Sequence, residues 1–386
     1  MRKIGLVKKK YLTRERIYLI IDYLLRHEKQ HKWTRGIRNE WTAFMEDVDR
    51  NVDILLWQLS HEEYEYGDFI EFDRIERGKL RKIFASHPVD QIVDQLLTDC
   101  LYYVFLDKKH IVPANCYGSI PGKGQHEMRR KIIRIVKGSK NLIAGIGDTK
   151  QYYPTMLHDL LYSMCERHIK DKWLLWLCKI TIYRMKGGRG LALGSPSSNI
   201  FGHLYHSELD WLIILGYKVR RYYRFCDNKF IIHKDAHYVH TVMRALKEGI
   251  EKLGQQMKSD WRVVNCNDER FDCLGSMVNS HGARMHRKTR RSAEQHMKVC
   301  IEQGDPIMAL RTWSGIRGTF NALSINNLLR YWRDRYEDFF LLVKEGRRIE
   351  RRNARRRKWH KKLNKILISC PDCRSDENKR KYPLAA

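Results

Sequence analysis

The chain has 386 residues, enough to bury a substantial core in two or three domains, and this length excludes a small peptide module. Its 74 Lys and Arg against 45 Asp and Glu give a formal net charge of +29. This charge favours a polyanionic partner such as nucleic acid; a general solubility surface and an acidic membrane surface are the alternatives. No apolar run reaches the roughly 18 residues that span a bilayer, and no secretion signal is visible, so we expect a cytosolic protein without a membrane partner.

The N-terminal region predicts helices. Apolar residues recur there at helical spacing, as at Ile17, Ile20 and Ile21. A mixed basic and apolar segment from Gly78 to Ser86 then predicts a strand, and the periodicity from Val89 to Leu106 predicts a helix.

The middle of the chain alternates glycine-rich loops with strands and helices. In chain order we expect a loop from Asn115 to His126, a basic helix from His126, a strand from Asn141 to Gly147, a helix from about Thr155, a loop from Lys186 to Pro196, a helix through Tyr205, a strand pair from Tyr217 to Phe225 and from Lys229 to His233, and an amphipathic helix from His237 to Met257.

Two acidic residues lie where predicted strands end or turn. Asp148 follows the first of these strands, and Asp227 lies in the Cys-Asp-Asn turn of the hairpin. Two carboxylates on adjacent strands can bridge a pair of Mg²⁺ ions, one activating a hydroxyl and the other clamping a triphosphate. Either aspartate alone would be an ordinary turn or cap residue, so the interpretation depends on the surrounding segments.

Five segments in order resemble motifs of the reverse transcriptase family. They are the loop from Asn115 to His126 (fingers motif), Asp148-Thr-Lys-Gln-Tyr-Tyr-Pro (first palm motif), Gly190 to Asn199 (template- and nucleotide-positioning motif), Tyr223-Arg-Phe-Cys-Asp-Asn (the Y/F-x-D-D hairpin) and Phe271-Asp-Cys-Leu-Gly (primer grip). The resemblance covers roughly residues 115–275. It implies an α+β right-hand polymerase whose palm is an antiparallel sheet backed by helices.

The resemblance also divides the chain. It implies an N-terminal helical extension at 1–75, fingers at 76–140, a palm at 141–283 with a fingers contribution around 170–195, and a helical basic thumb and tail at 284–386. The basic run from Arg347 to Lys365 suits a thumb that contacts the phosphates of an RNA–DNA hybrid, with a solvated charged helix as the alternative. Cys370 and Cys373 make half of a zinc site, and no second cysteine pair lies nearby.

Catalytic roles follow from the resemblance residue by residue. Asp148 and Asp227 would hold the metal ions with the carbonyl of Thr149, and Tyr153 would be the steric gate that excludes a 2′-hydroxyl; a core tyrosine is the alternative. Lys258 would protonate the departing pyrophosphate, although Lys252 is close in sequence and a solvated lysine is the default.

The resemblance assigns further residues to the nucleotide and to the nucleic acid. Arg81 would neutralise the triphosphate, with Lys79 and Lys82 as rivals, because planar bidentate phosphate binding favours arginine. Gly194 and Asn199 would position the nucleotide. Primer and template contacts are expected from Phe225, Leu274, Gly275, Arg287, Lys288 and Lys123.

Two positions depart from the family pattern. Asn228 replaces the second aspartate of the hairpin and brings no negative charge, so metal affinity should fall. Palm polymerases of some negative-strand RNA viruses use a Gly-Asp-Asn turn, and an engineered change is equally compatible with the sequence. Asn199 replaces the glutamine of the x-Gly-x-x-x-Ser-Gln pattern found in diversity-generating retroelements, which the chain resembles more than the Gln-Gly-x-x-x-Ser-Pro of group II intron enzymes.

The leading hypothesis is a bacterial or phage RNA-directed DNA polymerase of a retroelement or an antiviral defence system. It would use two Mg²⁺ ions, which Mn²⁺ can replace, an RNA template, a DNA or RNA primer and deoxynucleoside triphosphates. A structured noncoding RNA and an accessory protein are further candidate partners. The alternative is a catalytically attenuated palm protein, weakened by Asn228, that acts as an RNA-binding or partner-binding scaffold.

Overall fold

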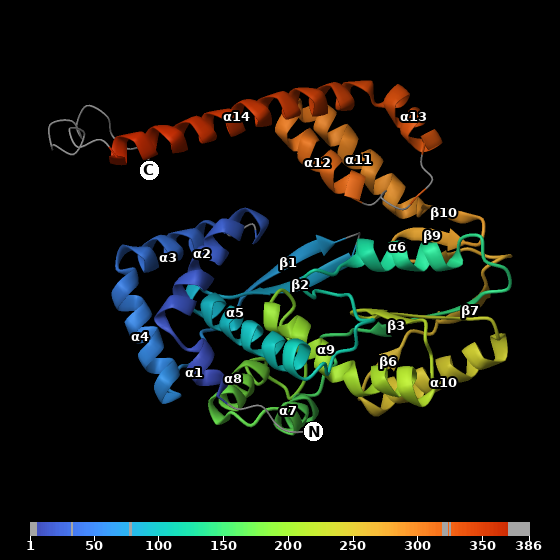
Figure 1. The fold of residues 1–386 in the computed structure, drawn as a ribbon, viewed down its shortest axis with the longest axis horizontal. Coiled ribbons are helices and arrows are strands. Elements are labelled where there is room, and N and C mark those ends of the chain that lie inside the picture. Colours follow the sequence, from blue (N-terminus) through green and yellow to red (C-terminus); the bar gives the residue numbers. More distant parts are fainter. Residues whose placement is uncertain (1–5, 32–33, 77–78, 319–322, 324–325, 370–386) are drawn as a thin grey trace. The chain divides into compact units, whose positions relative to one another are not determined.

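The computed structural model describes residues 6–31, 34–76, 79–318, 323 and 326–369. These residues form fourteen α-helices, two short π-helices and antiparallel sheets of two, three and five strands (Figure 1). The α+β class expected from the sequence is therefore confirmed. Among the helices of the described ranges, none is long and apolar enough to cross a membrane.

The N-terminal region is helical, as expected, up to His61. Its buried apolar residues, among them Ile17, Ile20 and Ile21, belong to the same core as α5, which α2 contacts. The chain then turns into a hairpin, so a strand already begins within residues 1–75. The elements of this region are α1 Val7–Tyr11, α2 Arg14–His31, α3 Arg35–Glu46, α4 Val48–His61, β1 Ile70–Glu76, β2 Lys79–Ala85, α5 Pro88–Tyr102 and the π-helix η1 Tyr103–Lys108.

The five-stranded sheet is built around β3. It has the order β4-β5-β3-β6, and β7 also pairs with β3. Helix α10 lies along one face of this sheet (Figure 1) and buries its predicted apolar stripe against it. Gly145 permits this approach, because a Cβ there would lie 2.8 Å from Met243 Cγ. The bounds are β3 Ile143–Lys150, β4 Tyr222–Phe225, β5 Asn228–His233, α10 Ala236–Lys252, β6 Gln256–Met257 and β7 Arg262–Asn265.

Helices flank the strands along the chain. The helix expected from about Thr155 begins at His158, and the helix through Tyr205 extends to Trp211. The bounds are α6 Gln125–Val136, α7 His158–His168, α8 Lys172–Ile182, α9 Pro196–Trp211 and the π-helix η2 Leu212–Gly216.

Several boundaries differ from the sequence prediction. The strand expected to end at Gly147 continues through Asp148 to Lys150, and two larger shifts have a visible cause. The helix expected to reach Met257 ends at Lys252, because Gly254 adopts a left-handed φ of +71° and the chain then adds β6 to the edge of β3. The strand expected from Tyr217 begins at Tyr222, because η2 prolongs α9 through Gly216. Apolar periodicity did not show either break.

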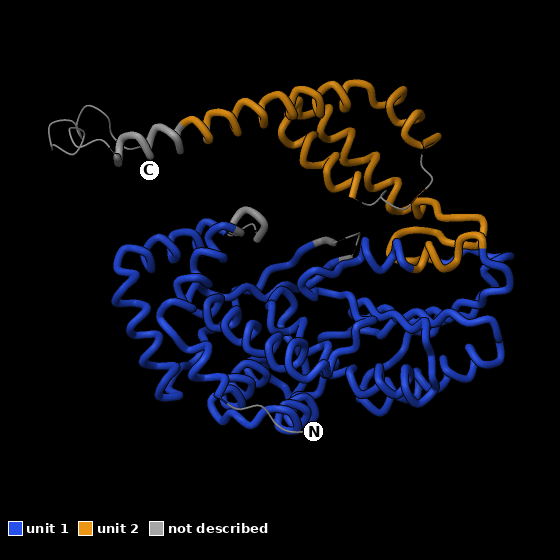
Figure 2. Tube along the Cα trace, viewed as in Figure 1, with its two compact units in different colours: residues 1–131, 139–271 blue, residues 132–138, 272–386 orange. Residues whose placement is uncertain are grey.

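The C-terminal region has a core of its own, formed by residues that include Met297, Trp313, Trp332 and Phe339. By contacts the chain splits into two compact units, residues 1–131 with 139–271 and residues 132–138 with 272–386 (Figure 2). Cys370 and Cys373 lie outside the described residues. The remaining elements are β8 Phe271–Asp272, β9 Ser276–Asn279, β10 Gly282–Met285, α11 Arg287–Gln303, α12 Pro306–Gly318, α13 Asn326–Arg335 and α14 Glu337–Ser369.

Candidate active site

The two candidate aspartates come together on paired strands. In the antiparallel register of β3 and β5, Asp148 lies opposite Asn228, the residue after Asp227. The amide of Thr149 donates to the carbonyl oxygen of Asp227 at 3.1 Å. Residues 79 positions apart in sequence (227 − 148) therefore share one end of the sheet.

Each carboxylate interacts with a neighbouring polar side chain. The ammonium of Lys258 pairs with Asp148, and the Lys258 amide also donates to the Asp148 carbonyl at 2.8 Å. The side-chain amide of Asn228 donates from Nδ2 to Asp227 Oδ1 at 3.0 Å. Burial, followed by the negative charge of Asp148, raises the pKa of Asp227.

The donor set suits a hard divalent cation. Asp148 Oδ1 is buried and has no hydrogen-bond partner in the described part of the chain. An orphaned carboxylate oxygen beside a second carboxylate is a natural ligand position for Mg²⁺ or Mn²⁺. The site is sparse, however, because the described residues contain no group of three or more His, Cys, Asp or Glu placed to hold a metal.

Lys229 contacts the two segments that bear the aspartates, and it was not among the predicted site residues. Its side chain is fully buried, and Nζ donates to Thr149 Oγ1 at 2.6 Å and to the Asp227 carbonyl at 3.1 Å. Burial, reinforced by the charge of Arg224, lowers the pKa of Lys229 to about 8. The only sequence signal was a lysine that opens an otherwise apolar strand.

The predicted gate residue and the predicted positioning residue are in contact. The Tyr153 hydroxyl donates to Asn199 Oδ1 at 2.6 Å, and its ring meets that of Tyr152 edge-on at 5.0 Å. The Leu191 amide donates to the Tyr153 carbonyl at 3.1 Å, which ties the Gly-rich loop to the segment after β3. Tyr153 is half-buried.

Strand β2 contacts the same Gly-rich loop. The Phe84 amide donates to the Leu193 carbonyl at 3.2 Å, and a Cβ on Gly194 would lie 3.4 Å from Ile83. Since side chains alternate along a strand, exposed Arg81 shares the face of Ile83.

Of the two rivals of Arg81, Lys82 forms an ion pair with Glu71 at 2.9 Å. The side chain of Lys79 lies outside the described part of the structure.

A buried ion pair contacts the Cys226-Asp227-Asn228 turn. Arg224 Nη2 lies 2.6 Å from Asp210 Oδ2, and Nε donates to both Asp210 oxygens at 2.9 Å. Tyr222 also donates to Asp210 at 2.6 Å, and Arg224 Nη1 donates to the Tyr152 hydroxyl at 3.1 Å. This network has no signal in the sequence, where Arg224 is one of several basic residues in a strand.

The loop that resembles the fingers motif lies against β4. The Arg224 amide donates to the Asn115 carbonyl at 3.1 Å, and the Tyr117 amide donates to the Arg224 carbonyl at 2.9 Å. Gly118 is in such close contact with the turn that a Cβ would lie 2.4 Å from Cys226 Sγ. Lys123 donates to the Ala114 carbonyl at 2.8 Å, so its ammonium braces this loop.

The other predicted contacts to nucleic acid divide between the two units. Phe225, at the end of β4, is half-buried and pairs with Asn228. In the C-terminal unit, Leu274 and Gly275 form a tight turn with φ of 51° and 86°, and the Gly275 amide donates to Asp272 Oδ1 at 2.8 Å. Arg287 and Lys288 are exposed at the start of α11.

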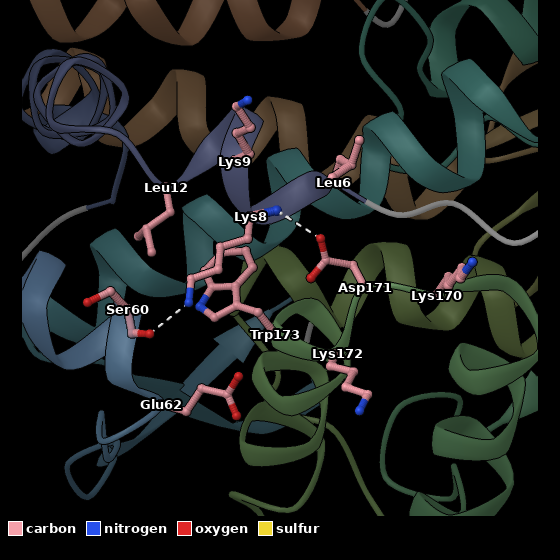
Figure 3. A pocket seen from close by; sticks show the side chains of 10 residues that line it. All are labelled: Leu6, Lys8, Lys9, Leu12, Ser60, Glu62, Lys170, Asp171, Lys172 and Trp173. Atoms are coloured by element: carbon pink, nitrogen blue, oxygen red, sulfur yellow. Dashed lines mark hydrogen bonds between the residues drawn. The ribbon is translucent and has the colours of Figure 1, made fainter.

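A separate pocket lies where α1 meets the start of α8 (Figure 3). The Asp171 carboxylate accepts from the amides of Val7 at 2.7 Å and Lys8 at 3.0 Å, and Lys8 Nζ donates to the Ser60 carbonyl at 2.7 Å. None of the residues predicted for the active site lines this pocket. Its polar contacts join α1 to α4 and α8 and carry no catalytic arrangement.

Comparison of the sequence with models of known protein families and with curated proteins finds no match. The fold and the site by themselves define an α+β protein with two carboxylates at one end of an antiparallel sheet. The finer assignment rests on the residues themselves.

Proposed function

We propose that the chain is an RNA-directed DNA polymerase with the right-hand architecture of reverse transcriptases. The observation that carries the proposal is the pairing of β3 with β5, which brings Asp148 and Asp227 to one end of the sheet. Two further segments with motif resemblance lie close to this site: the loop before α6 contacts β4 and Cys226, and the Gly-rich loop before α9 contacts Tyr153. A chance resemblance would not require these distant segments to meet.

In this proposal Asp148 and Asp227 hold the magnesium ions. When bound, these ions would activate the primer 3′-hydroxyl and neutralise the triphosphate of the incoming deoxynucleotide. Lys258 already contacts Asp148 and has a side chain that is 34% exposed, so it can move toward a leaving pyrophosphate. Tyr153, whose hydroxyl donates to Asn199, would be the ring that excludes a 2′-hydroxyl.

Further residues would contact the incoming nucleotide, the primer and the duplex. Arg81 is exposed on the face of β2 that meets the Gly194 loop, and a guanidinium there can bind the triphosphate in a bidentate manner. The C-terminal unit would supply Leu274 and Gly275 for the primer, and its basic helix α14 would bind the phosphates of the template–primer duplex.

One observation favours a second candidate, an attenuated palm protein that binds RNA or a partner. Asn228 replaces an acidic position, and both Lys229 and Lys258 lie beside the two remaining aspartates. The positive charge at the site would then oppose metal binding.

Primer extension on an RNA template with Mg²⁺ separates the two candidates. We expect slow extension by the unaltered chain, faster extension by Asn228→Asp, and none by Asp227→Ala. Equal activity of the Asp227→Ala chain, or no extension by either the unaltered or the Asn228→Asp chain, would contradict the polymerase proposal.

A further inference from the structure

The candidate metal site carries two ammonium groups. The partly exposed Lys258 forms an ion pair with Asp148. The buried Lys229 donates to Thr149 Oγ1 and to the Asp227 carbonyl. Two carboxylates and two lysines leave the local charge balanced without an ion. Asn228 adds none of the negative charge that an aspartate would bring.

The two lysines differ in how easily their side chains can move away from the aspartates. Lys258 is partly exposed and can swing into water when an ion takes its place. Lys229 is fully buried, and both of its hydrogen bonds go to the two segments that bear the aspartates. Its side chain therefore stays beside the site whatever binds there, and while protonated it repels a second cation strongly in a poorly solvated environment.

We infer that Lys229 is a positioning residue that acts as a fixed internal counter-cation, holding the strand ends together and lowering the affinity of the Asp148–Asp227 pair for divalent cations. The inference rests on the proposed function only in taking these aspartates as metal ligands. Its consequence is that the empty site is stable, and that an ion is retained mainly when a polyphosphate brings further negative charge.

The test is a titration of the full chain with Mn²⁺ at neutral pH, followed by electron paramagnetic resonance, with no nucleotide or nucleic acid present. The decisive variant is Lys229→Gln, because glutamine keeps a hydrogen-bond donor at the end of a side chain one atom shorter than that of lysine and carries no charge. Lys229→Met removes both the charge and the hydrogen bonds. Lys234→Gln removes an exposed lysine just beyond the same strand and is the matched control.

We expect Lys229→Gln to bind Mn²⁺ at least about tenfold more tightly than the unaltered chain, and Lys234→Gln to bind as the unaltered chain does. Asp227→Asn should abolish the gain, which locates it at the site. Unchanged or weaker binding by Lys229→Gln would overturn the inference. So would a change seen in Lys229→Met alone, since hydrogen bonding rather than charge would then be responsible.

This titration is independent of catalysis. If no variant extends a primer but Lys229→Gln still tightens Mn²⁺ binding, the proposed function fails and the inference stands. If the chain extends primers and Lys229→Gln leaves Mn²⁺ affinity unchanged, the inference fails and the proposed function stands.

Discussion

Tyr153 is half-buried and its hydroxyl donates to Asn199, and in the proposed function its ring is the steric gate. We predict that Tyr153→Ala raises incorporation of ribonucleotides relative to deoxynucleotides by about tenfold or more, because the steric barrier is lost. Tyr153→Phe keeps the ring and should retain the selectivity. Competition between the two nucleotide types in primer extension measures this, and an unchanged ratio in Tyr153→Ala would assign Tyr153 to the core instead.

Arg224 and Asp210 form a buried ion pair next to the Cys226-Asp227-Asn228 turn, with side chains 0% and 1% exposed. We predict that Arg224→Met lowers the free energy of unfolding by about 3–5 kcal/mol, because it leaves the Asp210 carboxylate buried and unpaired. The matched control is Arg167→Met, which breaks an exposed ion pair with Glu208 and should cost at most about 1 kcal/mol. Urea unfolding measures both, and equal losses would contradict this role.

His203 predicts an acid-dependent loss of stability. Burial, followed by the charge of Arg224, lowers its pKa to about 3 from the ordinary value of 6.5. Between these values the unfolded chain binds a proton that the folded chain does not, so stability falls as the pH drops below 6.5. From pH 7 to pH 5 this histidine should cost about 2 kcal/mol.

The measurement for His203 is urea unfolding at pH 7 and pH 5. In His203→Gln the drop between the two pH values should be smaller by about the same 2 kcal/mol. Exposed His237→Gln controls for the loss of a histidine. A drop of the same size in His203→Gln as in the unaltered chain would show that His203 is not its cause.

At the scale of elements, helix α14 presents arginines in two rows at i, i+4 spacing. They are exposed and lie on neighbouring faces of the helix. We predict that changing one row to glutamine lowers the slope of log affinity against log salt for an RNA–DNA duplex by about 2–3 units, because three phosphate contacts are lost. The rows are Arg347, Arg351 and Arg355, and Arg348, Arg352 and Arg356.

Filter binding at several salt concentrations measures this slope. The matched control changes three exposed basic residues of the N-terminal helices, Lys9, Arg35 and Arg50, which lowers the net charge by the same amount. An equal loss in both sets would show that the net charge, and not the two rows, determines binding.

The elements themselves were largely predictable where one period dominates. The stripe of α10, including Val239 and Met243, is buried as its spacing predicts. The end of α10 was not predictable. The glycine turn at Gly254 and the short strand after it depend on an edge of β3 that no local pattern reveals. The extension of α9 by a π-helix likewise has no local signal.

For the whole molecule, the sequence supplied the two aspartates but not what surrounds them. Their pairing depends on the antiparallel register of β3 and β5, and such long-range pairing cannot be read from either strand alone. Lys229 and Arg224 had no predicted role, and only the packed sheet shows that both are fully buried. The buried charged residues around the two aspartates are therefore the ones that sequence patterns do not reveal.

The central claim is that Asp148 and Asp227 direct templated DNA synthesis on RNA. The most direct measurement is to extend a DNA primer on an RNA template of defined sequence with the Asn228→Asp chain, Mg²⁺ and deoxynucleotides, and to sequence the product. We predict DNA complementary to the RNA, and no product from the same chain carrying Asp148→Ala. Absence of product from the Asn228→Asp chain, or product whose sequence is independent of the template, would contradict the claim.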